Sequence, residues 1–191
     1  MKLSDLYKGC RSYRRFRQDP IPEELWDEIM ENLRNANSGR NKQTLHFYLL
    51  KSPEVVAKMQ SMVHWAASLP KEIGTPRREE QPVGFVVIAI EPGSTPVVDI
   101  DVGISAHVIT TTAYEAGFGS CILGALNLKQ IAELIHLPED CTIRLAVALG
   151  KPGCTSTIVD PPADGNIDYY VDADRNYYVP KRKIEEIITV L

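Results

Sequence analysis

The sequence lacks several patterns that would place a protein in a well-known class. Its four cysteines form no Cys-x-x-Cys pair and its four histidines show no ligand spacing, so we expect reduced thiols and no metal site. No uncharged apolar run is long enough to span a membrane, and the N-terminus has no apolar signal core. The net charge of −4 argues against nucleic-acid binding as a main role. We therefore expect a cytoplasmic protein that binds neither membrane nor nucleic acid.

Phosphate-loop and hydrolase motifs are also missing. Gly124 is followed by Ala125 and Leu126, so the glycines near it do not form a Walker A loop. Ile122 stands where a dinucleotide-binding fingerprint needs a glycine. The sequence Gly-x-Ser-x-Gly does not occur, and spacing alone suggests no Ser/His/Asp set. The chain thus offers no side-chain nucleophile that could be recognised from its sequence.

The most apolar stretch is residues 97–124, and it predicts a buried helix. Apolar residues lie on nearly every side of the helical wheel, which is typical of a helix in a core or at a subunit interface. We expect His107 to be a buried core histidine and Gly117 to end the helix. Residues 118–124 predict a short extended segment with glycines, whose backbone can approach a flat or anionic ligand closely.

Hydrophobic periodicity predicts alternating helices and strands in one domain, residues 1–191. We expect helices at 3–9, 22–36, 53–66 and 128–135, and strands at 45–50, 83–90 and 143–149. We expect a mobile surface loop at 70–82, a long irregular excursion at 151–178 and a terminal helix at 180–191. This pattern alone is compatible with either an α+β or an α/β layered fold.

Two basic clusters lie near the ends of a chain that is acidic overall. They are Arg11, Arg14 and Arg15, and Lys181, Arg182 and Lys183. Cations are unfavourable in the first turn of a helix, where an anionic ligand is favoured. Either cluster alone is best explained as a solvated surface, whereas the two together favour a phosphate-bearing ligand. The amides of Asn41 and Gln43 can pair with the edge of a heteroaromatic ring, or equally well cap a turn.

Six segments of the chain resemble the FMN-dependent nitroreductase family. They are RSYRRF, PEELWDEIMENLRNANSGRNKQ, DVGISAHVITTTAYEAGFGSCILG, IHLPED, VALGKP and YYVPKRKIEEII. No single segment is specific, but together they occur in the family's order and cover nearly the whole chain. The resemblance implies an α+β fold of three layers, in which helices flank a central, mostly antiparallel sheet. It also implies an obligate homodimer with FMN at the subunit interface.

The resemblance further implies which residues bind FMN. Arg11, Ser12 and Arg14 resemble the segment that binds the phosphate and ribityl chain, and Lys181 and Arg182 resemble a late basic pair at the phosphate. Ser38, Asn41 and Gln43 resemble a loop that contacts the ribityl chain and the ring, from the same or the opposite subunit. Leu123 and Gly124 resemble the backbone beside the flavin, where an N–H donates to N5.

Some positions depart from the family pattern. Cys10 stands where a basic residue is common, and Arg40 replaces a frequent glycine. Thr44 and Leu45 replace the usual Pro-Trp pair, so the shape of the preceding loop is open.

The activity implied by the resemblance is that of a ping-pong flavin oxidoreductase. NADH or NADPH reduces FMN and leaves, and a nitroaromatic, a quinone or a similar small-molecule acceptor then takes its place. The cofactor carries the redox chemistry, so no catalytic side chain is expected. The alternatives are a reductive dehalogenase or flavin-breakdown enzyme of the same fold, and a flavin-binding module without turnover.

Overall fold

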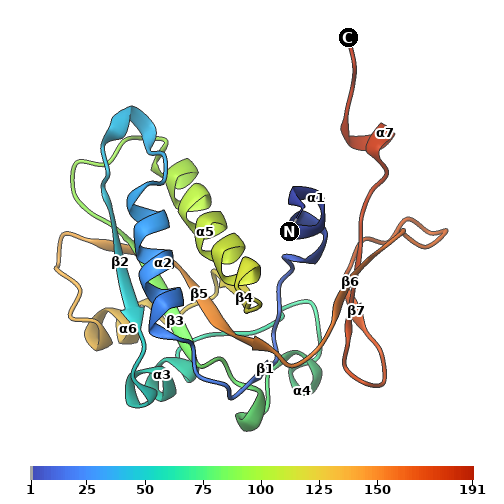
Figure 1. The fold of residues 1–191 in the computed structure, drawn as a ribbon, viewed down its shortest axis with the longest axis horizontal. Helices are drawn as coiled ribbons and strands as arrows, with labels where there is room; N and C mark the ends of the chain where they lie inside the picture. The colour runs from blue at the N-terminus through green and yellow to red at the C-terminus, as the bar shows by residue number, and fades with distance from the viewer. Residues whose placement is uncertain (1) are drawn as a thin grey trace.

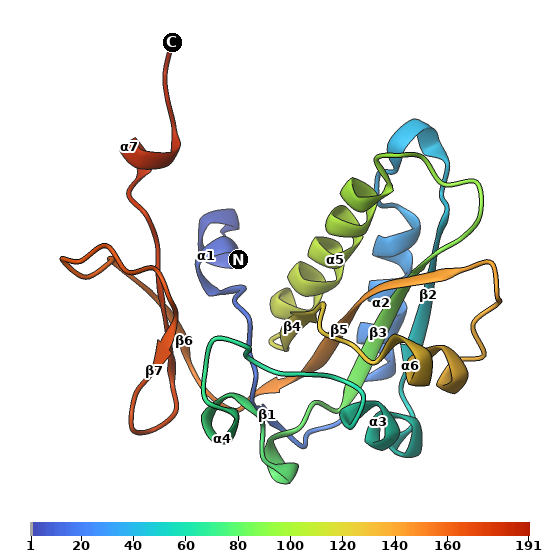
Figure 2. The same ribbon diagram turned by 180° about the vertical axis from the view of Figure 1, so that it is seen from behind.

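The computed structural model describes residues 2–191, which form three layers in the body of the protein (Figure 1). A central sheet lies between helices α2 and α5 on one face and helices α3 and α6 on the other (Figures 1 and 2). The helices are α1 (Leu3–Gly9), α2 (Glu23–Arg34), η1 (Gly39–Asn41), α3 (Pro53–Gln60), α4 (Lys71–Gly74), η2 (Arg78–Glu80), α5 (Val98–Glu115), α6 (Leu128–Leu134) and α7 (Ile184–Ile187). The strands are β1 (Phe16–Arg17), β2 (Leu45–Leu50), β3 (Gly84–Ile90), β4 (Gly119–Leu123), β5 (Thr142–Pro152), β6 (Ser156–Val159), β7 (Tyr170–Val171) and β8 (Tyr177–Pro180).

The central sheet is organised around β5, which pairs antiparallel with β3, β4 and β1. β2 pairs antiparallel with β3 at the edge. Side chains alternate between the two faces of a strand, so a strand buried on both faces reads as a continuous apolar run. In β3, Phe85 and Val87 enter the core under α3 and α6, whereas Val86 and Ile88 enter the core under α2 and α5. The α+β class and the antiparallel sheet flanked by helices are therefore confirmed.

Helix α5 has the predicted bounds, but only one of its sides is covered. Val102, Ala106 and Ile109 are buried against the sheet and α2, whereas Ile100 is 61% exposed. His107 is also exposed, and its ring stacks on Tyr7 with a centroid distance of 5.7 Å. The prediction of a buried core histidine is thus wrong. The all-round apolar pattern did not reveal which side of the helix the sheet covers.

The predictions for residues 70–82 and for the C-terminal region need correction. Residues 70–82 contain α4 and η2 and hold side chains of the N-terminal segment, so they are a structured connection. Residues 151–178 are not irregular throughout, because β6, β8 and β7 form a second sheet in which β6 and β8 run parallel.

The predicted terminal helix is reduced to the single turn of α7. Tyr177–Pro180 instead form β8, and all residues from 181 to 191 are exposed. A short amphipathic segment needs tertiary packing to remain helical, and this one has no surface to cover within the chain. The helix from Pro53 likewise ends at Gln60 rather than near residue 66.

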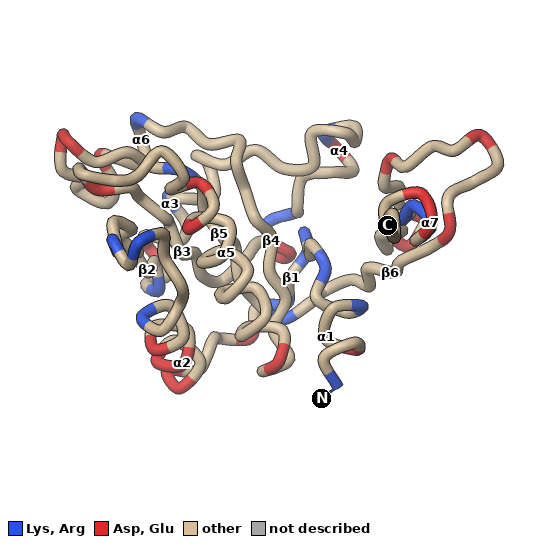
Figure 3. The backbone as a smooth tube through the Cα atoms, turned by 90° about the horizontal axis from the view of Figure 1, so that it is seen from above, with Lys and Arg blue, Asp and Glu red and all other residues tan. Residues whose placement is uncertain are grey.

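We call residues 156–191 the C-terminal arm. It lies beyond α1, away from the layers of the body, in both the front and the top view (Figures 1 and 3). Both signs of charge are spread over the body, as Figure 3 shows. Within residues 2–191, no helix has the length and apolar composition needed to cross a membrane.

Candidate functional site

The segment after α1 runs beside β4 and builds one edge of a small pocket. Ser12 forms a β-bridge with Ser120, and the Tyr13 N–H donates to the Ser120 carbonyl at 2.8 Å. The pocket has a volume of about 200 Å³ and is lined by Tyr7, Cys10, Arg11, Ser12, His107, Thr110, Ser120 and Ile122. Ile122 is 48% exposed although its neighbours Cys121 and Leu123 are buried. The site thus offers an apolar surface next to Arg11.

Arg11 and Arg14 both keep an uncompensated positive charge. Arg11 donates to the Cys10 carbonyl at 2.9 Å and to the Tyr7 carbonyl at 3.1 Å. The Arg14 guanidinium lies 4.5 Å from the centroid of the Tyr169 ring. Among the ion pairs of residues 2–191, neither arginine has a carboxylate partner. Carbonyls and rings position these guanidinium groups without neutralising them, so both can attract an anion.

Arg15 does not belong to this basic surface. Its side chain is 3% exposed and donates to the carbonyls of Ile73 and Arg175. Its Nε lies 3.8 Å from a carboxylate oxygen of Glu80. The guanidinium groups of Arg14 and Arg15 lie 5.2 and 5.1 Å from the same Tyr177 ring, but only Arg15 is buried and has a carboxylate neighbour. The prediction that the three N-terminal arginines form one anion-binding cluster is therefore wrong for Arg15.

Leu123 and Gly124 lie at the end of β4. Leu123 is buried, whereas Gly124 is exposed, and a Cβ atom added at Gly124 would meet no atom within 4 Å. The chain beyond is held by the His64 N–H, which donates to the Ala125 carbonyl at 3.0 Å. Backbone at Gly124 is thus positioned from both sides while it faces open space, as expected of backbone that contacts a flat ligand.

A tight loop contains Ser38, Asn41 and Gln43. It lies at the N-terminal end of α5, whereas Cys10 contacts the helix near its C-terminal end. The Gln43 N–H donates to Ser38 Oγ at 3.2 Å, and the Gln43 amide donates to the Asn41 carbonyl at 3.4 Å. Arg40, Asn41 and Gln43 have φ of 57°, 55° and 50°. Left-handed backbone at non-glycine residues is strained and concentrates at functional sites. No pattern in the sequence indicates this strain.

The start of α5 anchors the 38–43 loop, because the Gly39 N–H donates to Asp101 Oδ1 at 2.8 Å. At the other end, Cys10 Sγ contacts the Thr110 carbonyl at 3.4 Å. Residues 101 and 110 are nine positions apart, so the two anchors are separated by about 14 Å along the helix. The chain therefore does not bring Ser38, Asn41 and Gln43 against Arg11 and Ser12.

Lys181 and Arg182 lie on the C-terminal arm, directly after β8, and both are exposed. Arg182 pairs with Glu186 on the same arm at 3.4 Å. The ten predicted site residues thus do not form one site within a single chain. Arg11 and Ser12 line the pocket beside β4, Leu123 and Gly124 lie at the end of β4, and Arg14 contacts the Tyr169 ring of the arm. The remaining five residues lie on the 38–43 loop and on the arm.

Cys10 is a partly buried, protonated thiol rather than a reactive thiolate. Burial raises the pKa of Cys10, and the contact with Thr110 and the charge of Arg11 lower it by less. A raised pKa keeps the sulfur protonated near neutral pH, and the protonated form is a poor nucleophile.

The protein is a three-layer α+β protein, because its antiparallel sheet lies between two layers of helices. Cations flank the pocket at the β4 edge of this sheet, so the pocket can bind an anionic ligand. Residues 7–151 match the nitroreductase family, and the chain belongs to this family.

Solved structures share this fold at low identity. A nitroreductase with bound FMN from Desulfitobacterium hafniense is 21% identical, with a TM-score of 0.67 over 88% of this chain and 97% of that chain. An FMN-dependent nitroreductase from Clostridium difficile is 19% identical, with a TM-score of 0.67 over 81% and 90% of the two chains. Nitroreductase A from Vibrio parahaemolyticus is 23% identical, with a TM-score of 0.66 over 88% and 77%.

Proposed function

We propose that the protein is a cytoplasmic, FMN-dependent oxidoreductase. It uses NADH or NADPH to reduce a nitroaromatic, a quinone or a similar small-molecule acceptor by a ping-pong mechanism. Membership of the nitroreductase family supports the class of reaction. The observation that carries the proposal is the pocket in which Arg11, without a carboxylate partner, lies next to the exposed Ile122.

The chemistry of the donor set fits FMN. Arg11, Ser12 and Arg14 supply two cations and a hydroxyl for a phosphate, which prefers charge-assisted hydrogen bonds. Ile122 supplies apolar surface for a ring, and Gly124 supplies backbone that no side chain blocks. Bound FMN would supply the two-electron chemistry between donor and acceptor. The protein binds and orients the cofactor, and its backbone donors favour negative charge on the ring.

We further propose that the active form is a homodimer. The 38–43 loop and the pair Lys181 and Arg182 lie apart from Arg11 in one chain, so a second copy is needed to complete a site that uses all of them. Large apolar side chains also lie uncovered. On the arm, Ile184 is 71% and Ile187 59% exposed. Exposed apolar surface of this kind is typical of an interface.

One preparation tests the proposal. We expect the purified protein to be yellow, to retain FMN in a gel-filtration column and to elute as a dimer. Under anaerobic conditions, NADH or NADPH should bleach the flavin absorbance, and a quinone added afterwards should restore it. Colourless protein that takes up no FMN would refute flavin binding. A yellow protein that neither nucleotide bleaches would be a flavin-binding module without this activity.

A further inference from the structure

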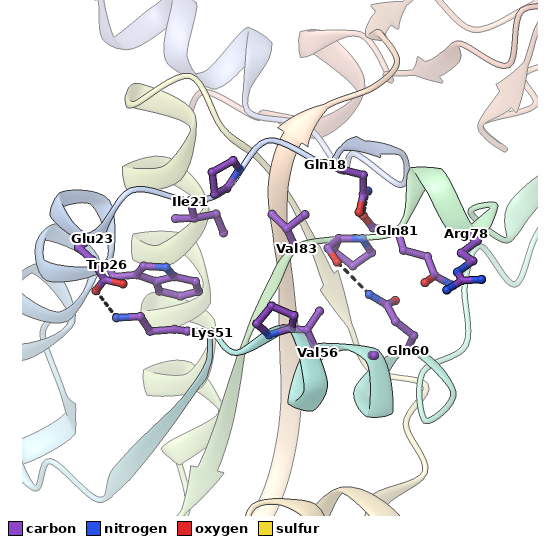
Figure 4. Close-up of a pocket in the computed structure, with 14 residues that line it drawn as sticks. Gln18, Ile21, Glu23, Trp26, Lys51, Val56, Gln60, Arg78, Gln81 and Val83 are labelled. Atoms are coloured by element: carbon purple, nitrogen blue, oxygen red, sulfur yellow. Dashed lines mark hydrogen bonds and ion pairs between the residues drawn. The ribbon is translucent and has the colours of Figure 1, made fainter.

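Two pockets lie at opposite ends of α2 and differ in how their polar groups are used. The pocket at the N-terminal end has a volume of about 530 Å³ and is also lined by α3 and by the connection from η2 into β3 (Figure 4). There Lys51 is paired with Glu23, and the amide nitrogens of Gln18 and Gln60 donate to backbone carbonyls. The pocket at the C-terminal end, of about 200 Å³, contains instead the buried carboxylate of Asp101.

Asp101 is a buried acid whose charge is balanced without a cation. It lies in the first turn of α5, is 3% exposed and takes part in none of the ion pairs of residues 2–191. Burying a carboxylate is costly unless other groups compensate it. The positive N-terminal end of α5 favours a negative charge there, and the Gly39 N–H donates to Asp101 Oδ1 at 2.8 Å. The partner of this carboxylate is thus the backbone of the 38–43 loop.

The other hydrogen bonds of the loop stay within it. The Asn41 N–H donates to the Ser38 carbonyl at 3.0 Å, and the Gln43 N–H donates to Ser38 Oγ at 3.2 Å. These bonds set the curvature of the loop but do not attach it to the body of the protein. The bond from the Gly39 N–H to Asp101 reaches α5, so it fixes where the loop lies.

The loop also needs an external contact because its backbone is strained. Arg40, Asn41 and Gln43 have left-handed φ values of 57°, 55° and 50°. Non-glycine residues persist in this conformation only when surrounding contacts hold them there. Asp101 binds the loop at Gly39, directly before the first strained residue. Without this contact, the strained residues can relax and move the side-chain amides of Asn41 and Gln43.

We propose that Asp101 is a positioning residue for the flavin site. Its carboxylate holds the 38–43 loop in the shape in which Asn41 and Gln43 contact FMN. The inference rests on the proposed function, in which this loop contacts the flavin. Asp101 acts through the Gly39 N–H rather than through a contact of its own with the ligand. A loop that is fixed before binding loses less conformational entropy on binding, which increases the affinity.

Three variants separate the hydrogen bond of Asp101 from other effects. Asp101→Ala removes the acceptor of the Gly39 N–H. Asp101→Asn keeps a carbonyl oxygen for this N–H, although a neutral acceptor forms a weaker bond than a carboxylate. Asp99→Ala is the matched control, because Asp99 is an exposed acid in the same turn of α5. Its ion pair with Arg144 is exposed and therefore contributes little to stability.

The first readout is the dissociation constant of FMN, measured by quenching of flavin fluorescence well below the melting temperature of each variant. We expect Asp101→Ala to bind FMN about ten-fold more weakly than wild type. Asp101→Asn should restore most of the affinity and remain within about three-fold of wild type. Asp99→Ala should bind FMN as wild type does. Equal affinity in Asp101→Ala and Asp99→Ala, or equal affinity in the two Asp101 variants, would overturn the proposal.

The second readout is amide hydrogen exchange in the flavin-free protein. In Asp101→Ala, the amides of the 38–43 loop should exchange about ten-fold faster than in Asp99→Ala, while those of β3 and β5 keep their rates, because the loop opens locally. An equal acceleration of the loop and of both strands would mean that Asp101 stabilises the whole fold, and the proposal would be wrong.

The two readouts also separate this inference from the proposed function. Wild-type protein that takes up no FMN would refute flavin binding and, with it, a role of Asp101 in a flavin site. Wild-type protein that binds FMN and is bleached by NADH or NADPH, with equal loop exchange in Asp101→Ala and Asp99→Ala, would refute the positioning role alone.

Discussion

Glu80 joins three segments that are far apart in the sequence, and its neutralisation should loosen all of them. Its carboxylate lies 2.5 Å from an Arg175 nitrogen and 3.8 Å from Arg15 Nε, and it accepts the Arg77 N–H at 2.9 Å. The Arg15 side chain is 3% exposed and that of Glu80 is 22% exposed. Glu80→Gln would leave a buried guanidinium without its anion.

The expected cost follows from this geometry. Removing one partner of a fully buried ion pair costs about 3–5 kcal/mol. Here two backbone carbonyls also accept from Arg15, Glu80 keeps some contact with water, and glutamine can still accept the Arg77 N–H. We therefore expect a loss of about 2–3 kcal/mol, which lowers the melting temperature by roughly 5–10 °C for a chain of this size.

Urea unfolding measures this loss, and Glu79→Gln is the matched control. Glu79 lies on the same turn, η2, and its side chain is exposed, so its neutralisation should change the free energy of unfolding by less than about 0.5 kcal/mol. If both variants unfold at the same urea concentration, the carbonyl groups alone compensate Arg15 and the reasoning is wrong.

The pH dependence gives a second check on Glu80. Burial acts to raise the pKa of Glu80, but the Arg77 N–H, Arg175 and Arg15 together lower it below its ordinary value. A lowered pKa in the folded state stabilises the fold above the unfolded pKa of about 4.3. This stabilisation is lost as the pH falls through the folded pKa. The difference between wild type and Glu80→Gln should therefore be largest near neutral pH and shrink in acid.

Three further predictions concern the site and the interface. Gly119→Ala should destabilise the protein by about 1–3 kcal/mol in thermal unfolding, because its Cβ would lie 2.8 Å from the Tyr13 ring; an unchanged melting temperature would contradict this. Arg14→Glu should weaken FMN retention on dialysis while Arg14→Lys loses less, and an unchanged affinity would remove Arg14 from the site. Ile187→Glu should shift the light-scattering mass towards the monomer, whereas Met30→Glu, an equally drastic change on an exposed side chain of α2, should leave it unchanged.

The resemblance in sequence predicted separate segments of the candidate site, but not how these segments contact one another. It indicated Arg11 and Ser12 and, separately, the stretch that ends at Gly124. Their adjacency to β4 depends on the bridge between Ser12 and Ser120, which joins residues more than a hundred positions apart. The exposure of Ile122 was not predictable, because a strand buried on both faces and one that borders a pocket have the same apolar composition.

The sequence by itself determined the elements whose pattern is local. The continuous apolar run of β3, the helical repeat of α2 and the side chain of Asn127, which caps α6, specify these elements because neighbours within a few residues define them. Periodicity failed for residues 180–191, since an amphipathic repeat does not tell whether any surface covers its apolar side.

Only the tertiary structure decided which distant side chains meet. It buried Arg15 against Glu80 and Arg175, paired β6 with β8, and separated the 38–43 loop from Arg11 along α5. It also formed the pocket that Gln60 and Arg78 share from different elements. Contacts of this kind depend on how packed layers meet in space, and no pattern within a short stretch of sequence encodes them.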